Sequence, residues 1–129
     1  MKELTKAEEQ IMQILWEIKK GFIKDIADGF PDPKPANTTI STVVKILETK
    51  GFINHNVYGK IHEYYPAINK EAYTKAFMGN IVKNYFSNSY QKMVSFFARD
   101  KEVTIEEMEQ MMNILKEEMQ KRKRRPNAL

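Results

Sequence analysis

The feature that most constrains the fold is a short β-forming segment, FINHNVYGKIHEYYP (residues 52–66), that directly follows a helical pattern. Two runs rich in Ile, Val, Tyr and Phe flank Tyr58-Gly59-Lys60, and Gly59 supplies the positive φ that a hairpin turn needs. Pro66 ends the second strand, because proline cannot donate to a strand ladder. An isolated hairpin is only marginally stable in water, so this one must pack against the helices around it.

Three helical patterns precede the hairpin. A capping box of Thr5 and Glu8 predicts the start of the first helix, and Gly21 predicts its C-terminal stop. The segment FIKDIADGF (residues 22–30) predicts a short second helix. Three prolines then predict a loop, and a third helix follows from Asn37, its expected N-cap, to Lys50-Gly51. Helix, helix, loop, helix and hairpin is the order of a winged helix-turn-helix, a mainly α fold with a small β-hairpin.

The third helix has two different faces. At about 100° per residue, an apolar stripe forms from Ile40, Val43, Val44 and Leu47. The opposite face carries Thr38, Ser41, Thr42, Lys45 and Thr49, with Thr39 at its edge. Hydroxyl residues are mediocre helix formers, so they are either neutral filler or a surface that touches a partner at short range.

The hairpin decides between these two interpretations, because a winged helix places the helix before its wing in the DNA major groove. Hydroxyls donate to and accept from base edges, and the Thr methyl packs on the thymine methyl group. The basic and histidine side chains nearby are suited to phosphate contacts. We therefore predict a DNA-binding surface made of Thr38, Thr39, Ser41, Thr42, Lys45, His55 and Lys60.

The character of the chain changes after Pro66. Asn69 is a candidate N-cap, and a second capping box joins Thr104 to Glu107 at the start of a Met-rich stripe. Helices of this length bury little apolar surface alone, so self-association is the natural way to cover them. We predict that a homodimer buries Tyr73, Phe77, Ile81, Met108, Leu115 and Met119 between its chains.

The predicted organisation is a winged-helix DNA-binding domain over residues 1–68 and a C-terminal helical dimerisation module over residues 69–122. Residues 123–129 are expected to be a disordered basic tail. The sequence pI is about 9.2, but residues 1–68 carry 9 basic and 9 acidic side chains, and the excess positive charge lies in KRKRRPNAL. Net charge is therefore no argument for DNA binding. Because phosphate contacts dominate affinity for DNA, a protein-interaction module without specific DNA binding stays an open alternative.

Several functional classes are excluded by residue type. The chain has no cysteine, which removes disulfides and thiol catalysis, and it has no Gly-rich phosphate loop or HExxH motif. His55, His62 and Glu63 lie close together in the sequence, but histidines on a wing are more often solvated or phosphate-facing than metal ligands. We expect no enzymatic activity, cofactor, metal or small-molecule ligand. No apolar run approaches the length of a membrane span and no signal peptide is evident, so we expect a cytoplasmic protein.

The sequence resembles the penicillinase-repressor (BlaI/MecI/CopY) family of winged-helix transcriptional regulators over nearly its whole length. The resemblance rests on the order and spacing of LTKAEEQIMQILW, TTISTVVKILETKGFI, GKIHEYYP and MVSFFARDKEVTIEEMEQMMNIL. It implies a dimeric repressor on a dyad operator upstream of resistance or stress genes, with recognition-helix threonines at Thr39 and Thr42. Other members carry Lys or Arg where this chain has Thr38 and Ser41, so the operator sequence does not carry over.

The resemblance also implies a route of induction. Family members that respond to β-lactams are cleaved in the dimerisation helices, commonly at an Asn-Phe bond, and a membrane sensor metallopeptidase is the implied partner. The matching bond here is Phe96-Phe97, in a segment whose apolar middle predicts a buried helix. The residue after the bond agrees with the family and the residue before it differs. The paired cysteines of the copper-responsive branch are absent, so copper sensing is not expected.

Overall fold

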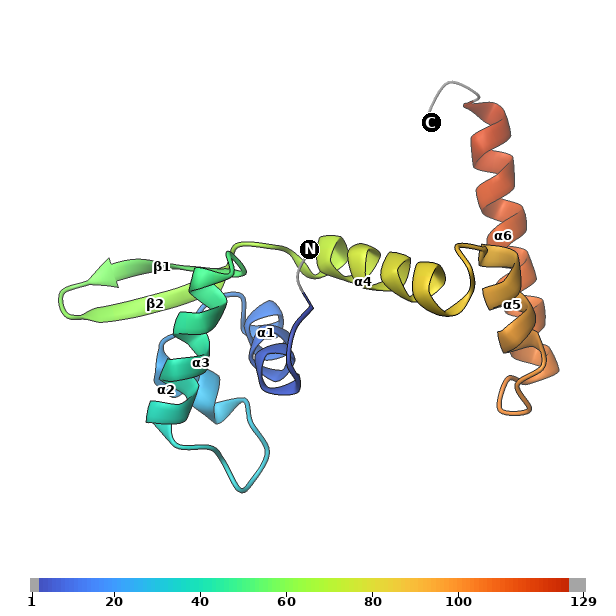
Figure 1. The fold of residues 1–129 in the computed structure, drawn as a ribbon. Coiled ribbons are helices and arrows are strands. Elements are labelled where there is room, and N and C mark those ends of the chain that lie inside the picture. The colour runs from blue at the N-terminus through green and yellow to red at the C-terminus, as the bar shows by residue number, and fades with distance from the viewer. Residues whose placement is uncertain (1–2, 126–129) are drawn as a thin grey trace. The chain divides into compact units, whose positions relative to one another are not determined.

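A computed structural model describes residues 3–125 of the chain (Figure 1). These residues fall into two units, and the boundary between them along the chain lies between Gly79 and Asn80. The predicted functional boundary after residue 68 stays a prediction. The division between the units instead falls inside a helix, because the first turns of that helix pack on the N-terminal unit.

The N-terminal unit contains helices α1 (Lys6–Ile18), α2 (Ile23–Asp28) and α3 (Asn37–Thr49), followed by strands β1 (Ile53–Tyr58) and β2 (Ile61–Pro66). The two strands form an antiparallel hairpin in which Ile53 pairs with Pro66 and Tyr58 pairs with Ile61. Gly59 in the turn has φ 61°, the left-handed conformation expected from the sequence. This is the winged helix-turn-helix order, with the hairpin extending away from the three helices as the wing (Figure 1).

Two predicted helix ends need correction. Ala36 caps α3 with no side-chain hydrogen bond, and Asn37 is the first helical residue. At the end of α1, Lys19 takes the positive φ of 75° and Gly21 lies beyond the cap. Gly21 instead pairs with Tyr64 of β2, with N–O distances of 2.9 and 2.7 Å in the two directions. A side chain at Gly21 would come within 2.9 Å of Asp25 in α2 and of Ile18 in α1, so glycine lets the chain turn closely between these two helices.

The hydrophobic core joins the three helices to the base of the hairpin. As the periodicity predicts, α3 buries Ile40, Val44 and Leu47, while Val43 is half-buried. The core as a whole consists of Ile11, Met12, Leu15, Ile26, Ala27, Ile40, Val44, Leu47, Phe52, Ile53, Tyr64 and Tyr73. One continuous core therefore fixes the orientation of α3 relative to the hairpin.

Tyr73 departs from the expectation that it lies between two chains. It belongs to α4 (Lys70–Tyr85), and only 8% of its surface is exposed in a single chain. Its ring centroid lies 5.5 Å from that of Trp16 and 5.9 Å from that of Phe52. The Trp16 indole also donates to the carbonyl of Ile68 at 2.9 Å. These contacts attach the first turns of α4 to the N-terminal unit and leave Tyr73 little surface for a partner.

The C-terminal unit holds the rest of α4, α5 (Tyr90–Ala98) and α6 (Ile105–Arg124). Asn69 caps α4 by accepting from the Ala72 amide at 2.7 Å, and the predicted capping box of Thr104 and Glu107 opens α6. α6 continues through Lys123 and Arg124, two residues into the expected tail, and residues 126–129 lie outside the described part of the chain. The sequence predicts a buried helix around Phe96-Phe97. The structure shows the helix, α5, but none of its residues is buried in a single chain.

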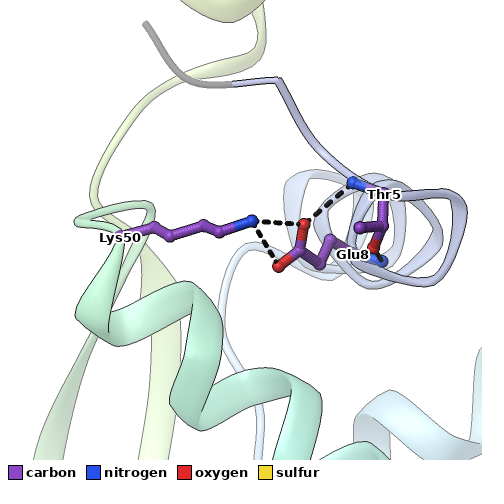
Figure 2. Close-up of polar contacts among 3 residues, drawn as sticks. All are labelled: Thr5, Glu8 and Lys50. Carbon is purple, nitrogen blue, oxygen red and sulfur yellow. Dashed lines mark hydrogen bonds and ion pairs between the residues drawn. The ribbon is translucent and has the colours of Figure 1, made fainter.

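A buried ion pair connects the start of α1 to the end of α3. Only 3% of the Glu8 surface is exposed, and Lys50 Nζ lies 2.8 Å from both carboxylate oxygens (Figure 2). Glu8 Oε1 also accepts from the Thr5 amide at 2.8 Å, which completes the capping box. Burial alone would raise the pKa of Glu8, but hydrogen bonds from Lys50 and Thr5 and the Lys50 charge outweigh it and lower the pKa below 4.5.

We expect Glu8→Ala to lower the free energy of unfolding at pH 7 by about 3 kcal/mol, because it leaves Lys50 and the Thr5 amide without their acceptor. A lowered folded-state pKa gives a stabilisation that is complete above the unfolded-state pKa. It is lost as the pH falls through the folded value. The stability difference between Glu8→Ala and the parent should therefore shrink in acid.

Urea unfolding followed by fluorescence of Trp16, the single tryptophan, measures this difference. Glu17→Ala is the matched control, because Glu17 lies on the exposed side of the same helix. Equal losses in the two variants at pH 7 would show that the ion pair does not stabilise the fold.

Candidate nucleic-acid interface

The polar face of α3 is open to solvent and lies next to the wing. Thr38, Thr39, Thr42, Lys45 and Thr49 are exposed along it, and Ser41 is half-buried at its edge. α3 packs on α1, α2 and β1 through its opposite side. The core thus holds the helix so that its hydroxyl face points away from the rest of the unit, which is the arrangement that a groove-reading helix requires.

Two hydroxyls on this face are already used as donors. Thr42 Oγ1 donates to the Thr38 carbonyl at 2.9 Å, and Thr49 Oγ1 donates to the Lys45 carbonyl at 3.0 Å. A hydroxyl held in this way can still accept a hydrogen bond, and both threonine side chains are exposed. Thr42 is therefore suited to the amino group of adenine or cytosine and to the methyl group of thymine.

Ile46 is a residue of this surface that the sequence reasoning missed. Its side chain is 44% exposed. At 100° per residue it lies between Thr42 and Thr39 around the helix axis, outside the core stripe. An exposed apolar side chain among hydroxyls offers another contact for thymine methyl groups. The angular placement that separates the two faces of the helix is the signal that identifies Ile46 as part of the outer face.

The wing is tied to α3 through His55. His55 Nδ1 lies 2.8 Å from Glu48 Oε2, and the His55 ring stacks on His62 with centroids 4.1 Å apart and planes 2° from parallel. Tyr64 lies edge-on to both rings, and burial together with the Glu48 charge raises its pKa. The sequence predicts His55 as a phosphate contact, and the structure gives it a carboxylate partner, Glu48, that joins the wing to α3.

Lys60 lies in the wing turn and lines a surface groove of about 370 Å³ with Lys24 of α2. The other residues that line this groove are Phe22, Ile23, Ile61, His62 and Tyr64. Lys24 was not predicted as a contact, because nothing in the sequence shows that α2 and the wing turn line the same groove. The two ammonium groups add positive charge beside the wing, where phosphate oxygens would pass.

We expect Lys45→Gln and Lys60→Gln each to reduce the slope of log affinity against log salt by about one unit, because each lysine would release one counterion from DNA on binding. Titration of labelled duplex at several salt concentrations measures the slope. Lys75→Gln is a control, since Lys75 is exposed on α4 and outside this surface. A slope unchanged by both test variants would remove these two lysines from the interface.

The residues predicted for dimerisation and cleavage are open to solvent in a single chain, apart from Tyr73. Phe77 is 42% exposed, Leu115 58% and Met119 51%, whereas Ile81 and Met108 are half-buried. Phe96 and Phe97 of α5 are 54% and 43% exposed. Large apolar side chains exposed on the helices of the C-terminal unit are typical of an interaction surface.

Over residues 3–125, no three or more His, Asp or Glu side chains are placed together to hold a metal ion. No helix within the same range is both long and apolar enough to cross a membrane.

Comparisons with known proteins show what this chain is similar to. The family model described as penicillinase repressor matches residues 4–117. The methicillin resistance regulatory protein MecI of Staphylococcus aureus (strain N315) is 25% identical over 114 residues, which cover 88% of this chain and 93% of that protein. The penicillinase repressor of Bacillus licheniformis is 24% identical over 126 residues, covering 94% of this chain and 95% of that protein. The solution structure of monomeric Bacillus licheniformis BlaI with the blaP half-operator aligns at TM-score 0.47 and 23% identity, over 56% of this chain and 89% of that one.

Proposed function

The chain belongs to the penicillinase repressor family, and we propose that it represses transcription as a homodimer bound to a two-fold symmetric DNA operator. The relatives that it matches over most of their length are a resistance regulator and a penicillinase repressor. The chain is accordingly a DNA-binding repressor and not an enzyme. The homodimer, the symmetric operator and the mode of induction are the proposed parts.

One observation carries the proposal, namely the hydroxyl face of α3 beside the wing. Thr39 and Thr42 are exposed on that face, and Lys45 follows them on the same side of the helix. Hydroxyls can supply base contacts and lysines can supply phosphate contacts, so one surface combines groups that read sequence with groups that position the protein on the duplex.

The exposed apolar surface of α5 and α6 supports the homodimer. Neither helix buries a residue in a single chain, although α6 carries Ile105, Met112 and Leu115 at helical spacing. A second copy is the simplest cover for these side chains, since two-fold dimers use the same patch on both subunits. A two-fold dimer would place its two α3 helices in successive major grooves of a dyad operator.

We further propose that cleavage between Phe96 and Phe97 relieves repression, with a membrane sensor metallopeptidase as the protease. α5 has 9 residues, none of them buried, and its N-cap hydrogen bond from Lys92 to Ser89 is 3.2 Å long. Isolated helices of this length are marginal in water, so α5 can open to the extended form that a protease requires. The cut would separate α6 from the DNA-binding unit.

Competition binding tests the DNA-binding proposal. A labelled duplex from upstream of the genes that the protein controls is bound first and then competed with unlabelled duplex. Displacing it should take about 10³-fold or more random duplex than unlabelled duplex of the same sequence. Equal displacement by both duplexes at every salt concentration would instead favour a protein-interaction module.

Immunoblotting of the repressor from cells exposed to a cell-wall antibiotic tests cleavage. Full-length repressor during derepression would exclude proteolysis as the switch.

A further inference from the structure

α6 presents a continuous apolar stripe, and within the described residues 3–125 most of it is exposed. The stripe consists of Ile105, Met108, Met112, Leu115 and Met119, at alternating spacings of three and four residues. Met108 is half-buried, and the other four side chains are between 51% and 74% exposed. Alternating spacings of three and four are the pattern of a helix seam that packs against a second helix.

The charges of α6 are separated along its length. Glu106 and Glu107 lie in the first turn, whereas the last turn holds Lys121, Arg122, Lys123 and Arg124. A parallel partner helix with the same sequence would place the two basic ends side by side and the two acidic ends side by side. An antiparallel partner would place each basic end beside an acidic end.

We infer that α6 pairs with α6 of a second copy in antiparallel orientation, with Met108 of one chain facing Met119 of the other. The inference rests on the homodimer proposed above and adds its orientation and register. The occupant of the stripe is a second copy, because the charge pattern of α6 is complementary to itself when one copy is reversed.

The register follows from the seam. The stripe alternates between two heptad positions, one holding Ile105, Met112 and Met119 and the other holding Met108 and Leu115. In an antiparallel pair, residues of the first position face residues of the second position on the other chain. This gives layers of Met108 with Met119 and of Met112 with Leu115. At the ends, the aliphatic stem of Arg122 covers Ile105 and its guanidinium remains in water. A parallel pair would instead place Arg122 against Arg122.

The same register explains the charges that flank the seam. Glu109, Lys116 and Lys123 share one flank of the stripe, since they are spaced by seven residues. In an antiparallel pair this flank meets the same flank of the second copy, so Glu109 lies between Lys116 and Lys123 of the other chain. In a parallel pair the flank meets the opposite one, and Glu109 does not meet Lys116.

Disulfide trapping in the full-length chain tests the orientation, because the natural sequence has no cysteine. Met108→Cys and Met119→Cys chains with tags of different size are mixed, refolded together and mildly oxidised. We expect the mixed Met108→Cys to Met119→Cys disulfide as the main crosslinked species on a non-reducing gel. Gln110→Cys is the control for random collision, because Gln110 lies on the opposite face of the helix.

Charge reversal gives a second measurement that does not depend on oxidation. We expect Glu109→Lys to weaken dimerisation by about fivefold at low salt, and Lys116→Glu in the same chain to restore most of the loss. Sedimentation equilibrium measures both.

The outcomes separate the inference from the proposed function. Predominant homodisulfides of Met108→Cys or Met119→Cys, in a protein that still dimerises, would overturn the antiparallel arrangement alone. Crosslinking no stronger than that of Gln110→Cys would also overturn it. A full-length chain that sediments as a monomer would overturn the homodimer itself.

Discussion

A double substitution of Thr39→Leu and Thr42→Leu should reduce operator affinity to that of random DNA, a loss of about 10³-fold or more. Both threonines are exposed on the outer face of α3, so leucine at these positions disturbs no packed neighbour. Leucine is also the better helix former, and the fold should be at least as stable as before. The loss would come from the added bulk in the groove and from the missing hydroxyls.

Competition titration with operator and random duplex measures the effect, and urea unfolding confirms that the fold is intact. Thr74→Leu is the matched control, because Thr74 is exposed on α4 away from the hydroxyl face. Operator affinity unchanged in the double variant would mean that α3 is not the recognition helix.

Two single substitutions would separate the contributions of Thr42. Thr42→Val keeps the methyl group and replaces the hydroxyl by a second methyl group, whereas Thr42→Ser keeps the hydroxyl and removes the methyl group. Since the Thr42 hydroxyl already donates to the Thr38 carbonyl, only its acceptor role is available to DNA. Loss of affinity mainly in the valine variant would point to an amino group on the contacted base, and loss mainly in the serine variant to a thymine methyl.

The local features of the fold could be predicted from the sequence because each depends on a few neighbouring residues. The capping boxes at Thr5 and Thr104 each involve a partner three residues away, and Gly59 alone marks the wing turn. The two faces of α3 follow from its periodicity. These signals were sufficient for the winged helix-turn-helix and for the exposed hydroxyl face of α3.

The features that escaped prediction depend on residues far apart in the chain. Glu8 and Lys50 are separated by 42 positions, and Trp16 and the Ile68 carbonyl by 52. Nothing near Tyr73 in the sequence shows that its ring packs against Trp16, so it was assigned to the dimer and not to the core. The same holds for Gly21, whose pairing with Tyr64 of β2 required the hairpin to be placed first.

The placement of Tyr73 bears on where the DNA-binding unit can be separated from the rest. A chain that ends near residue 70 would lose the Tyr73 ring from the core and expose Phe52 and Trp16. A chain that ends at Gly79 keeps these contacts, because the N-terminal unit extends to that residue. The longer fragment is therefore the one to compare with the full-length protein.

We expect the fragment of residues 1–79 to bind a dyad operator about 10²–10⁴-fold more weakly than the full-length chain. The fragment retains the hydroxyl face and the wing, so each half-site contact is unchanged. What it lacks is α5 and α6, which hold the second DNA-binding unit near the second half-site in the proposed homodimer. Without them, binding to the second half-site no longer benefits from a raised effective concentration.

A single half-site duplex is the control for this comparison. The fragment and the full-length chain should bind it with similar affinity, because only one DNA-binding unit can engage. A chain that ends at Phe96 reproduces the proposed cleavage and should behave like the shorter fragment, since it also lacks α6. If instead the fragment of residues 1–79 bound the dyad operator as tightly as the full-length chain, dimerisation would add nothing to repression, and cleavage at Phe96-Phe97 could not act as the switch.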